Sequence, residues 1–348
     1  MPSIRSFSVS VAAVCSALLL PIGAQAHHSF APHFDNKKPV SISGKVTAFE
    51  ARNPHSYLHL KAVDENGRTE EYVCESHGYT QLGRIGITPA VLKVGTQVRI
   101  EGSRSRNDAH RCFFTEIYFA DGRVLHVNEN PARPATQAVR SDITGTWLLA
   151  PRVGRGTSDP QPMMAFLTPA GKTAVDHYDP FKDDPAFRCD PVAVRRVWGA
   201  PGTPLSITRE KDRVILRHEW MDVKRIVRLD QREHPKNGAR TSLGHSIGHF
   251  EGDTLVIETA NFSAGVLNQY VEQPGQPTRG LLHSAALTSV EKVHLDAAKQ
   301  QLVVEVTLKD PEFFTHDFEP WTTEYNPSDL KIEPFTCSPE GVDGTLKK

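Results

Sequence analysis

The chain has 348 residues, which is enough for two domains with separate hydrophobic cores. Its 40 Lys and Arg residues nearly balance its 41 Asp and Glu residues. No field of one sign therefore directs the chain to nucleic acid or to an anionic membrane surface, and bulk charge identifies no partner.

The N-terminus is typical of a secretory signal peptide over residues 1–26. Arg5 precedes an apolar run from Val9 to Ile22, which is followed by Ala24-Gln25-Ala26, a small-x-small cleavage pattern. The run is shorter than the ~20 residues of a membrane span, and no later segment is long and apolar enough to be one. We therefore expect a periplasmic or secreted protein without a membrane span.

Four cysteines follow the signal peptide, which itself contains Cys15. An even number in an oxidising compartment favours disulfides over metal thiolates, and four cysteines allow three connectivities. We favour Cys74 with Cys112 and Cys189 with Cys337, because each pair then lies inside one expected domain. Buried free thiols are the alternative.

Residues 27–127 predict a small β-domain. Alternating apolar residues and turn signals indicate a short helix at His77–Ile85 or Pro89–Lys93 and strands at Val40–Glu50, His55–Val63, Arg68–Glu75, Thr96–Ser103 and Phe113–Phe119. This order is that of a five-stranded OB-like barrel. Nucleic acid is not expected as a partner, because the segment lacks a basic groove with interleaved aromatic residues.

Residues 128–141 have scattered prolines and no apolar period, so they predict a linker. Residues 142–348 then predict a larger antiparallel β-domain, with strands at Pro204–Thr208, Val214–Glu219, Val223–Leu229, Leu281–Leu295 and Gln301–Leu308. The segment Ile143-Thr144-Gly145-Thr146-Trp147 resembles the Gly-x-Trp opening of lipocalin-like barrels. That resemblance implies a barrel in which Trp147 closes the floor and touches a ligand.

The stretch Leu243–Phe262 predicts a hairpin that turns at Glu251-Gly252-Asp253. Period-2 alternation places His245, Ile247 and His249 on one face of its first strand. The other face carries Gly244, Ser246 and Gly248, and such a bare face lets a ligand or another backbone approach closely. We take this hairpin as the wall of a binding cavity.

Two families without an assigned function share motifs with the chain. Ala26-His27-His28-Ser29-Phe30, Asn53-Pro54-His55 and Asp121-Gly122-Arg123 resemble short exported bacterial proteins that begin, once processed, with His-His-Ser-Phe. The second domain is similar to another exported group at Leu243–Gly248, Glu251–Leu255, His283-Ser284 and Glu291. Neither resemblance implies a reaction.

The first candidate site is a proton-transfer set made of His245, His283, Glu291 and Asp253, with Ser246, His249 and Trp147 as ligand contacts. An imidazole paired with a carboxylate moves protons near pH 7, so a lyase or isomerase without a cofactor is one hypothesis for a small, largely apolar substrate. The structural alternatives are that Asp253 only sets the turn, that Glu291 is a surface charge and that the histidines are buried framework.

The second candidate site is a copper centre at the processed terminus. Cleavage after Ala26 leaves His27 with a free amine and an imidazole, a ligand set that suits tetragonal Cu(II). His28 and His55 are the preferred further ligands, and His33, His59 and His77 are alternatives. A solvated, unliganded terminus is the competing interpretation. The alternative function is thus a periplasmic copper-binding or carrier protein, and no oligomeric state is predicted.

Overall fold

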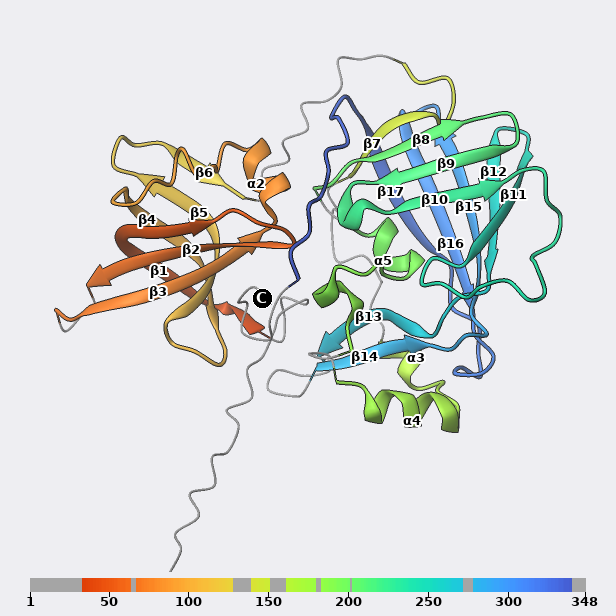
Figure 1. Ribbon diagram of the computed structural model, residues 1–348, viewed down its shortest axis with the longest axis horizontal. Helices are drawn as coiled ribbons and strands as arrows, with labels where there is room; N and C mark the ends of the chain where they lie inside the picture. The colour runs from red at the N-terminus through yellow and green to blue at the C-terminus, as the bar shows by residue number, and fades with distance from the viewer. Residues whose placement is uncertain are drawn as a thin grey trace, which may run out of the picture.

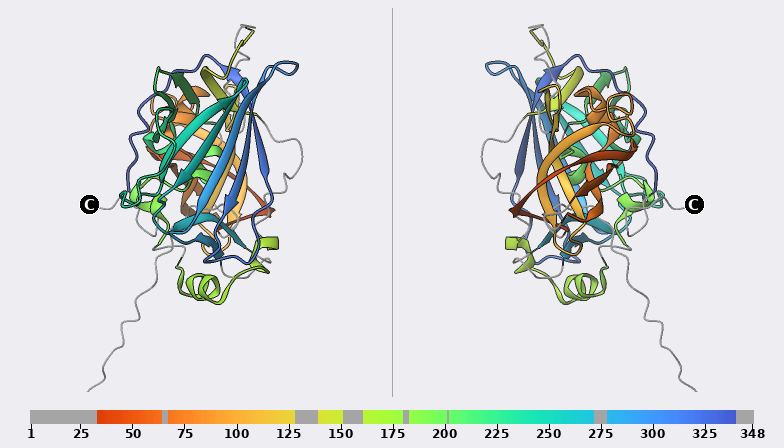
Figure 2. Two further views of the ribbon diagram at one scale, coloured as in Figure 1. Left: turned by 90° about the vertical axis from the view of Figure 1, so that its right-hand side faces the viewer. Right: turned by 90° about the vertical axis from the view of Figure 1, so that its left-hand side faces the viewer.

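The computed structural model describes residues 33–63, 67–127, 139–150, 161–179, 183–200, 202–271 and 278–339. The described chain is dominated by strands, which form an N-terminal sheet and a closed barrel (Figure 1). Figure 2 views the same arrangement from the barrel side and from the sheet side. The predicted all-β architecture, with a small unit followed by a larger barrel, is confirmed.

The N-terminal unit has the strand order expected for an OB-like barrel. Its elements are β1 (Phe34–Glu50), β2 (His55–Val63), β3 (Thr69–His77), α2 (Tyr79–Arg84), β4 (Gln97–Ser105), β5 (Arg111–Phe119) and β6 (Val124–His126). The sheet order is β3-β2-β1-β4-β5-β6, and an additional β3–β5 pairing returns the sheet onto itself. Five strands thereby form a ring with a short helix between β3 and β4. The sequence does not predict β6.

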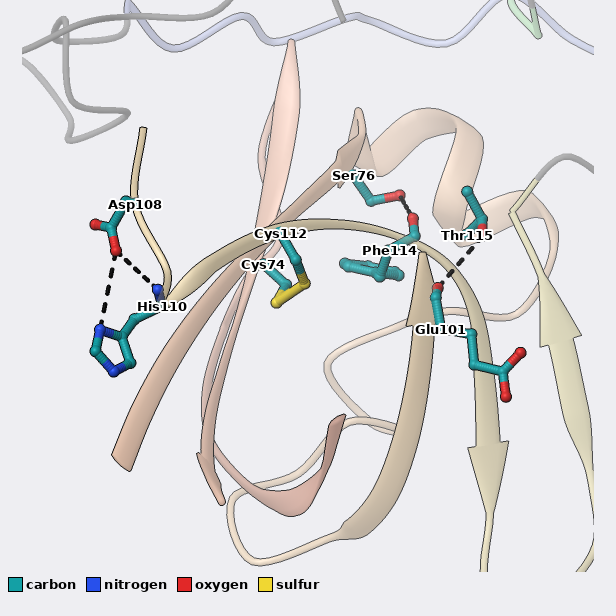
Figure 3. The surroundings of a disulfide bond; sticks show 8 residues. All are labelled: Cys74, Ser76, Glu101, Asp108, His110, Cys112, Phe114 and Thr115. Atoms are coloured by element: carbon teal, nitrogen blue, oxygen red, sulfur yellow. Dashed lines mark hydrogen bonds and ion pairs between the residues drawn. A yellow bond between two sulfur atoms is a disulfide. The ribbon is translucent and has the colours of Figure 1, made fainter. Parts of the chain in front are cut away.

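A disulfide lies on the seam that closes this ring (Figure 3). Cys74 of β3 and Cys112 of β5 are Cα partners in a parallel ladder of three residue pairs. Ser76 Oγ continues the seam by donating a hydrogen bond to the Phe114 carbonyl at 3.0 Å. The predicted Cys74–Cys112 bridge is confirmed, and it reinforces a short ladder.

The barrel closes in the order β10-β11-β12-β15-β16-β17-β7-β8-β9. Its strands are β7 (Gly145–Leu149), β8 (Leu205–Arg209), β9 (Arg213–His218), β10 (Lys224–Arg228), β11 (His245–Glu251), β12 (Thr254–Ala260), β15 (Thr288–Asp296), β16 (Gln301–Lys309) and β17 (Trp321–Ser328). Its pairings are antiparallel except that of β10 with β11. Because parallel neighbours need a crossover, a long connection over 229–244 separates those two strands.

Further elements cover one end of the barrel. They are α3 (Gln161–Met164), α4 (Pro169–His177), η1 (Pro185–Arg188), α5 (Val194–Trp198), η2 (Trp220–Asp222) and a ribbon of β13 (Gly265–Val271) with β14 (Thr278–His283). In Figure 1, the ribbon lies at the lower end of the barrel, and α5 lies between the ribbon and β10. Trp198 of α5 and Leu281 of β14 belong to the same hydrophobic core as the inward residues of the strands. Ala186 of η1 and Met221 of η2 belong to a smaller separate cluster.

The expected single strand Leu281–Leu295 is wrong. Ser284 breaks it, because its N–H and Oγ both donate to the Asp310 carboxylate, at 2.6 and 2.7 Å. The chain therefore turns between β14 and β15, and His283 lies on the ribbon rather than on the barrel wall.

A C-terminal segment joins the two units. Residues 329–338, called the strap here, follow β17 and pass between the sheet and the barrel (Figure 1). Ser338 N donates to the Asn53 carbonyl of the N-terminal unit at 2.8 Å, and the disulfide from Cys337 to Cys189 ties the strap to the barrel unit. The second predicted bridge is confirmed. None of the helices in the described ranges has the length and apolar character needed to cross a bilayer.

Candidate functional site

A buried ion pair lies inside the barrel. Arg225 follows Val223 and precedes Val227 on the inward face of β10, and Glu291 projects inward from β15. Arg225 Nη1 and Nη2 each lie 2.8 Å from one oxygen of the Glu291 carboxylate. The two residues are only 3% and 0% exposed. This bidentate geometry is the strongest form of a carboxylate–guanidinium contact.

Four neutral side chains add further hydrogen bonds to the pair. Trp198 Nε1, from the end of α5, donates to Glu291 at 2.6 Å, and Ser289 Oγ donates to it at 3.2 Å. Arg225 Nη2 donates to Ser246 Oγ at 3.2 Å and to Thr259 Oγ1 at 3.3 Å. Because each partner comes from a different element, the cluster fixes α5 against β10, β11, β12 and β15.

The small-residue face of β11 makes room for this cluster. Ser246 lies opposite Thr259, and Gly248 lies opposite Ile257, so both point into the barrel. A Cβ at Gly248 would lie 2.7 Å from Val227 Cγ1, which leaves no space for a side chain there. The bare face of the hairpin thus serves close packing around a large buried guanidinium.

His218 lies beside the ion pair. It is the last residue of β9, is 5% exposed, and its ring centroid is 5.1 Å from that of Trp198. Since Leu216 is the Cα partner of Arg225, His218 is its diagonal neighbour on the inward face. Burial first, and the Arg225 charge second, lower the pKa of His218 to about 3. The imidazole is therefore neutral at physiological pH.

Two polar atoms of this cluster lack a partner among the described residues. They are Nε of Arg225 and Nε2 of His218, both buried. Buried polar groups almost always have a hydrogen-bond partner, and leaving one unmade costs roughly 1–3 kcal/mol. The site therefore calls for a partner that the described side chains do not supply.

The structure places His245 away from this cluster. Its neighbour Ser246 faces inward, so His245 projects from the outer face of the barrel, where its Nδ1 lies 3.0 Å from Nδ1 of His234. Burial, followed by the proximity of His245, lowers the pKa of His234. His245 therefore does not share the barrel interior with Glu291, the carboxylate of the predicted proton-transfer set.

His283 and Asp253 also lie apart from Glu291. His283 is 1% exposed on the ribbon, where its Nδ1 lies 3.0 Å from the Ser284 carbonyl and its ring meets Phe262 edge-on. Asp253 is exposed in the turn between β11 and β12. The four residues of the predicted proton-transfer set are therefore not brought together.

Of the three predicted ligand contacts, two are buried and one lies on the outer face of the barrel. Ser246 belongs to the buried cluster through Arg225. Trp147 is fully buried, and its Nε1 donates to the Ile143 carbonyl at 2.9 Å. His249 lies outside, with its Nε2 3.2 Å from Glu251.

Several histidines gather at one end of the N-terminal unit. His55, at the start of β2, and His77, at the end of β3, are Cα partners. His55 Nδ1 lies 3.6 Å from the Glu75 carboxylate. His33, just before β1, is buried, and burial followed by the proximity of His55 lowers its pKa to about 3.

The copper ligands His27 and His28 lie outside the described residues. Within the described ranges, no group of three or more His, Cys, Asp or Glu side chains is arranged to hold a metal ion. A copper centre at His55 would thus need ligands from the terminus.

Comparison with known proteins finds a family match over the first part of the chain. A family of unknown function, DUF6152, matches residues 15–113. The chain has no significant match among curated proteins. The match supports the expected resemblance of the first part of the chain to a family without a known function, and it says nothing about the barrel.

Sequence reasoning missed Arg225, His218 and Trp198. A signal for the first two was present, because the alternation Val223, Arg225, Val227 puts a cation on an apolar face, as Val214, Leu216, His218 does for an imidazole. A charge at such a position predicts a buried partner of opposite sign. Trp198 carries no comparable signal, because it reaches the cluster from a short helix.

Proposed function

We propose that this chain is an exported protein, cleaved after Ala26, whose barrel binds a small, largely apolar molecule beside Arg225 and His218. The supporting observation is the pair of buried polar atoms, Arg225 Nε and His218 Nε2, that lack a partner among the described residues. Around them, the inward side chains are mainly apolar, including Leu216, Val227 and Ile257. Two disulfides agree with an oxidising compartment.

Binding fits this geometry better than acid–base conversion does. Both oxygens of Glu291 are held by Arg225, so the carboxylate is engaged as a partner rather than presented to a substrate. His245 is on the outer face, and His283 is on a separate ribbon. A lyase or isomerase would have to bring these groups to one substrate.

The direct test is to isolate the exported protein under native conditions and analyse an organic extract for a stoichiometric small molecule. Rebinding of that molecule is then followed by tryptophan fluorescence, with Trp198→Phe identifying the reporting indole. His218→Phe removes Nε2 but keeps an aromatic ring beside Trp198, and we expect it to weaken binding about tenfold, the effect of one buried hydrogen bond. His249→Gln on the outer face is the matched control. Equal affinity of the His218→Phe variant and the wild type would reject this site.

The second candidate function is copper binding by the processed terminus and the N-terminal unit. It is favoured by the gathering of His33, His55 and His77 at the end of the unit where the chain enters β1. His27 is six residues before His33, so it can lie at most about 20 Å away. Imidazole and amine nitrogens together suit tetragonal Cu(II).

This proposal is tested by intact mass followed by Cu(II) titration with electron paramagnetic resonance. We expect a first residue of His27 and one tight equivalent of copper. An added Ala before His27 moves the amine away from the imidazole, and His55→Ala removes a ligand, so both should abolish the tight equivalent. His110→Ala, at an exposed position, is the control. A tight site that survives both changes contradicts the proposal.

A further inference from the structure

We infer that the molecule bound inside the barrel is electrically neutral and carries a carbonyl or hydroxyl oxygen that bonds to Arg225 Nε and His218 Nε2. This inference deepens the proposed binding function and rests on it. It assigns the chemical class of the ligand from the charges and hydrogen-bonding groups that surround the two unsatisfied atoms.

The first step of the argument is charge balance. Arg225 and Glu291 form a closed bidentate pair, so together they contribute no net charge. His218 is neutral beside them, and the remaining partners of the pair are hydroxyls and an indole. An anion would face Glu291 and a cation would face Arg225, and neither would have a free counter-charge in a medium where unpaired charge is costly.

The second step concerns hydrogen-bonding roles. A guanidinium Nε carries a hydrogen and no lone pair, so its partner must be an acceptor. A neutral imidazole nitrogen donates or accepts according to its tautomer, so a hydroxyl oxygen satisfies both atoms, and a carbonyl does so when Nε2 carries the hydrogen. A pure hydrocarbon satisfies neither atom.

The third step concerns the walls. The ring of Trp198 meets the ring of Tyr325 edge-on, with 6.0 Å between the ring centroids. The ring of Trp198 also meets the ring of His218 edge-on, at an interplanar angle of 83°. The Tyr325 hydroxyl donates to the Trp198 carbonyl, which fixes α5 against β17. On the strands that carry Arg225 and His218, the neighbouring inward residues Leu216 and Val227 are buried and apolar. A molecule with one oxygen on an otherwise apolar skeleton matches that surface.

The inference is tested with four probes of one ring skeleton: cyclohexanone, cyclohexanecarboxylate, cyclohexylammonium and methylcyclohexane. Binding to the folded wild-type protein at pH 7 is measured by tryptophan fluorescence and by thermal shift. We expect cyclohexanone to bind at least about tenfold tighter than each of the other three, since each lacks either neutrality or an acceptor. A preference for the carboxylate or the ammonium would overturn the inference and leave the binding function standing.

A variant that removes the negative charge of Glu291 gives a sharper test, because it should reverse the order of probe affinities. In Glu291→Gln the Arg225 charge loses its partner, so the same site should now prefer cyclohexanecarboxylate over cyclohexanone. The control is Glu251→Gln, which is exposed on the barrel surface and should keep the wild-type order. A folded Glu291→Gln protein that retains the ketone preference contradicts the charge argument; if the variant does not fold, the wild-type probe series decides alone.

The remaining outcome is occupancy by water. Ordered water can satisfy both atoms, since a buried water typically makes about three hydrogen bonds. If no probe binds and no molecule is extracted from the native protein, the polar atoms hold water only, and the binding function and the inference both fail.

Discussion

At the residue scale, His218 links the stability of the barrel to pH. The pKa of its folded form is lowered to about 3, whereas the unfolded chain titrates near the ordinary histidine value of 6.5. Between these values the unfolded state binds a proton that the folded state does not. The contribution of the neutral His218 to the free energy of unfolding is therefore complete above pH ~6.5. It decreases as the pH falls, by about 1.4 kcal/mol per pH unit.

We predict that His218→Phe flattens this dependence. The variant has no imidazole to protonate, so between about pH 4 and pH 6 its free energy of unfolding should fall less steeply than that of the wild type, by up to about 1.4 kcal/mol per pH unit. Urea titrations at several pH values measure both slopes. His33, whose pKa is also lowered by burial, is present in both proteins, so its contribution to the pH dependence cancels in the comparison. Parallel slopes for variant and wild type would show that the buried imidazole does not control this range.

The residues of β11 show how far sequence reasoning reaches at this scale. Alternation correctly separates Ser246 and Gly248 from His245 and His249. It does not say which face is inside, because that depends on the volume of Arg225 and Trp198, which come from other elements. The small residues face inward because the large side chains opposite them need the space.

At the element scale, the β11–β12 hairpin contains glycines with different tasks. Gly252 lies in the turn at φ +60°, with no atom within 4 Å of the place where a Cβ would be. Gly248 lies in the strand, where a Cβ would approach Val227 Cγ1 at 2.7 Å and the Val256 carbonyl oxygen at 2.9 Å. One glycine provides a backbone conformation and the other provides space.

We predict that Gly248→Ala and Gly252→Ala differ in how they affect the interior. The new methyl group at 248 should displace Val227 next to Arg225, destabilise the barrel by about 1–3 kcal/mol and change Trp198 fluorescence. Gly252→Ala should cost about 1 kcal/mol through its left-handed backbone and leave that fluorescence unchanged. Urea unfolding and emission spectra measure both effects. An unchanged spectrum in Gly248→Ala would argue against tight packing between β11 and β10.

The ribbon shows what local patterns miss at this scale. Strands β8, β9, β10, β11, β12 and β16 follow from alternation and turn residues, because those signals are local. The break between β14 and β15 depends on Asp310, which lies 26 residues beyond Ser284. A capping partner so far along the chain leaves no periodic signal, so alternation alone predicts one continuous strand through His283.

At the scale of the whole molecule, the two units are held by buried contacts at the strap. Arg84 of α2 reaches the fully buried Glu219 of the barrel unit, with Nη1 2.7 Å from Oε1. Glu333 N of the strap donates to the same carboxylate at 2.9 Å. Both disulfide pairs could be predicted by keeping each cysteine pair within one unit. The contacts of the strap could not be predicted from the sequence, because they join distant parts of the chain without a periodic pattern.

Opening the Cys189–Cys337 disulfide should therefore loosen both units. The bridge spans 148 residues, and the loss of loop-closure entropy corresponds to at most about 5 kcal/mol of stability. In a Cys189→Ser, Cys337→Ser protein we expect faster amide hydrogen exchange around Asn53 and in α2, because the strap no longer holds them. The matched Cys74→Ser, Cys112→Ser protein should instead exchange faster along the β3–β5 seam. Unchanged exchange at Asn53 and α2 in the first protein would mean that Arg84 and Glu219 alone hold the units together.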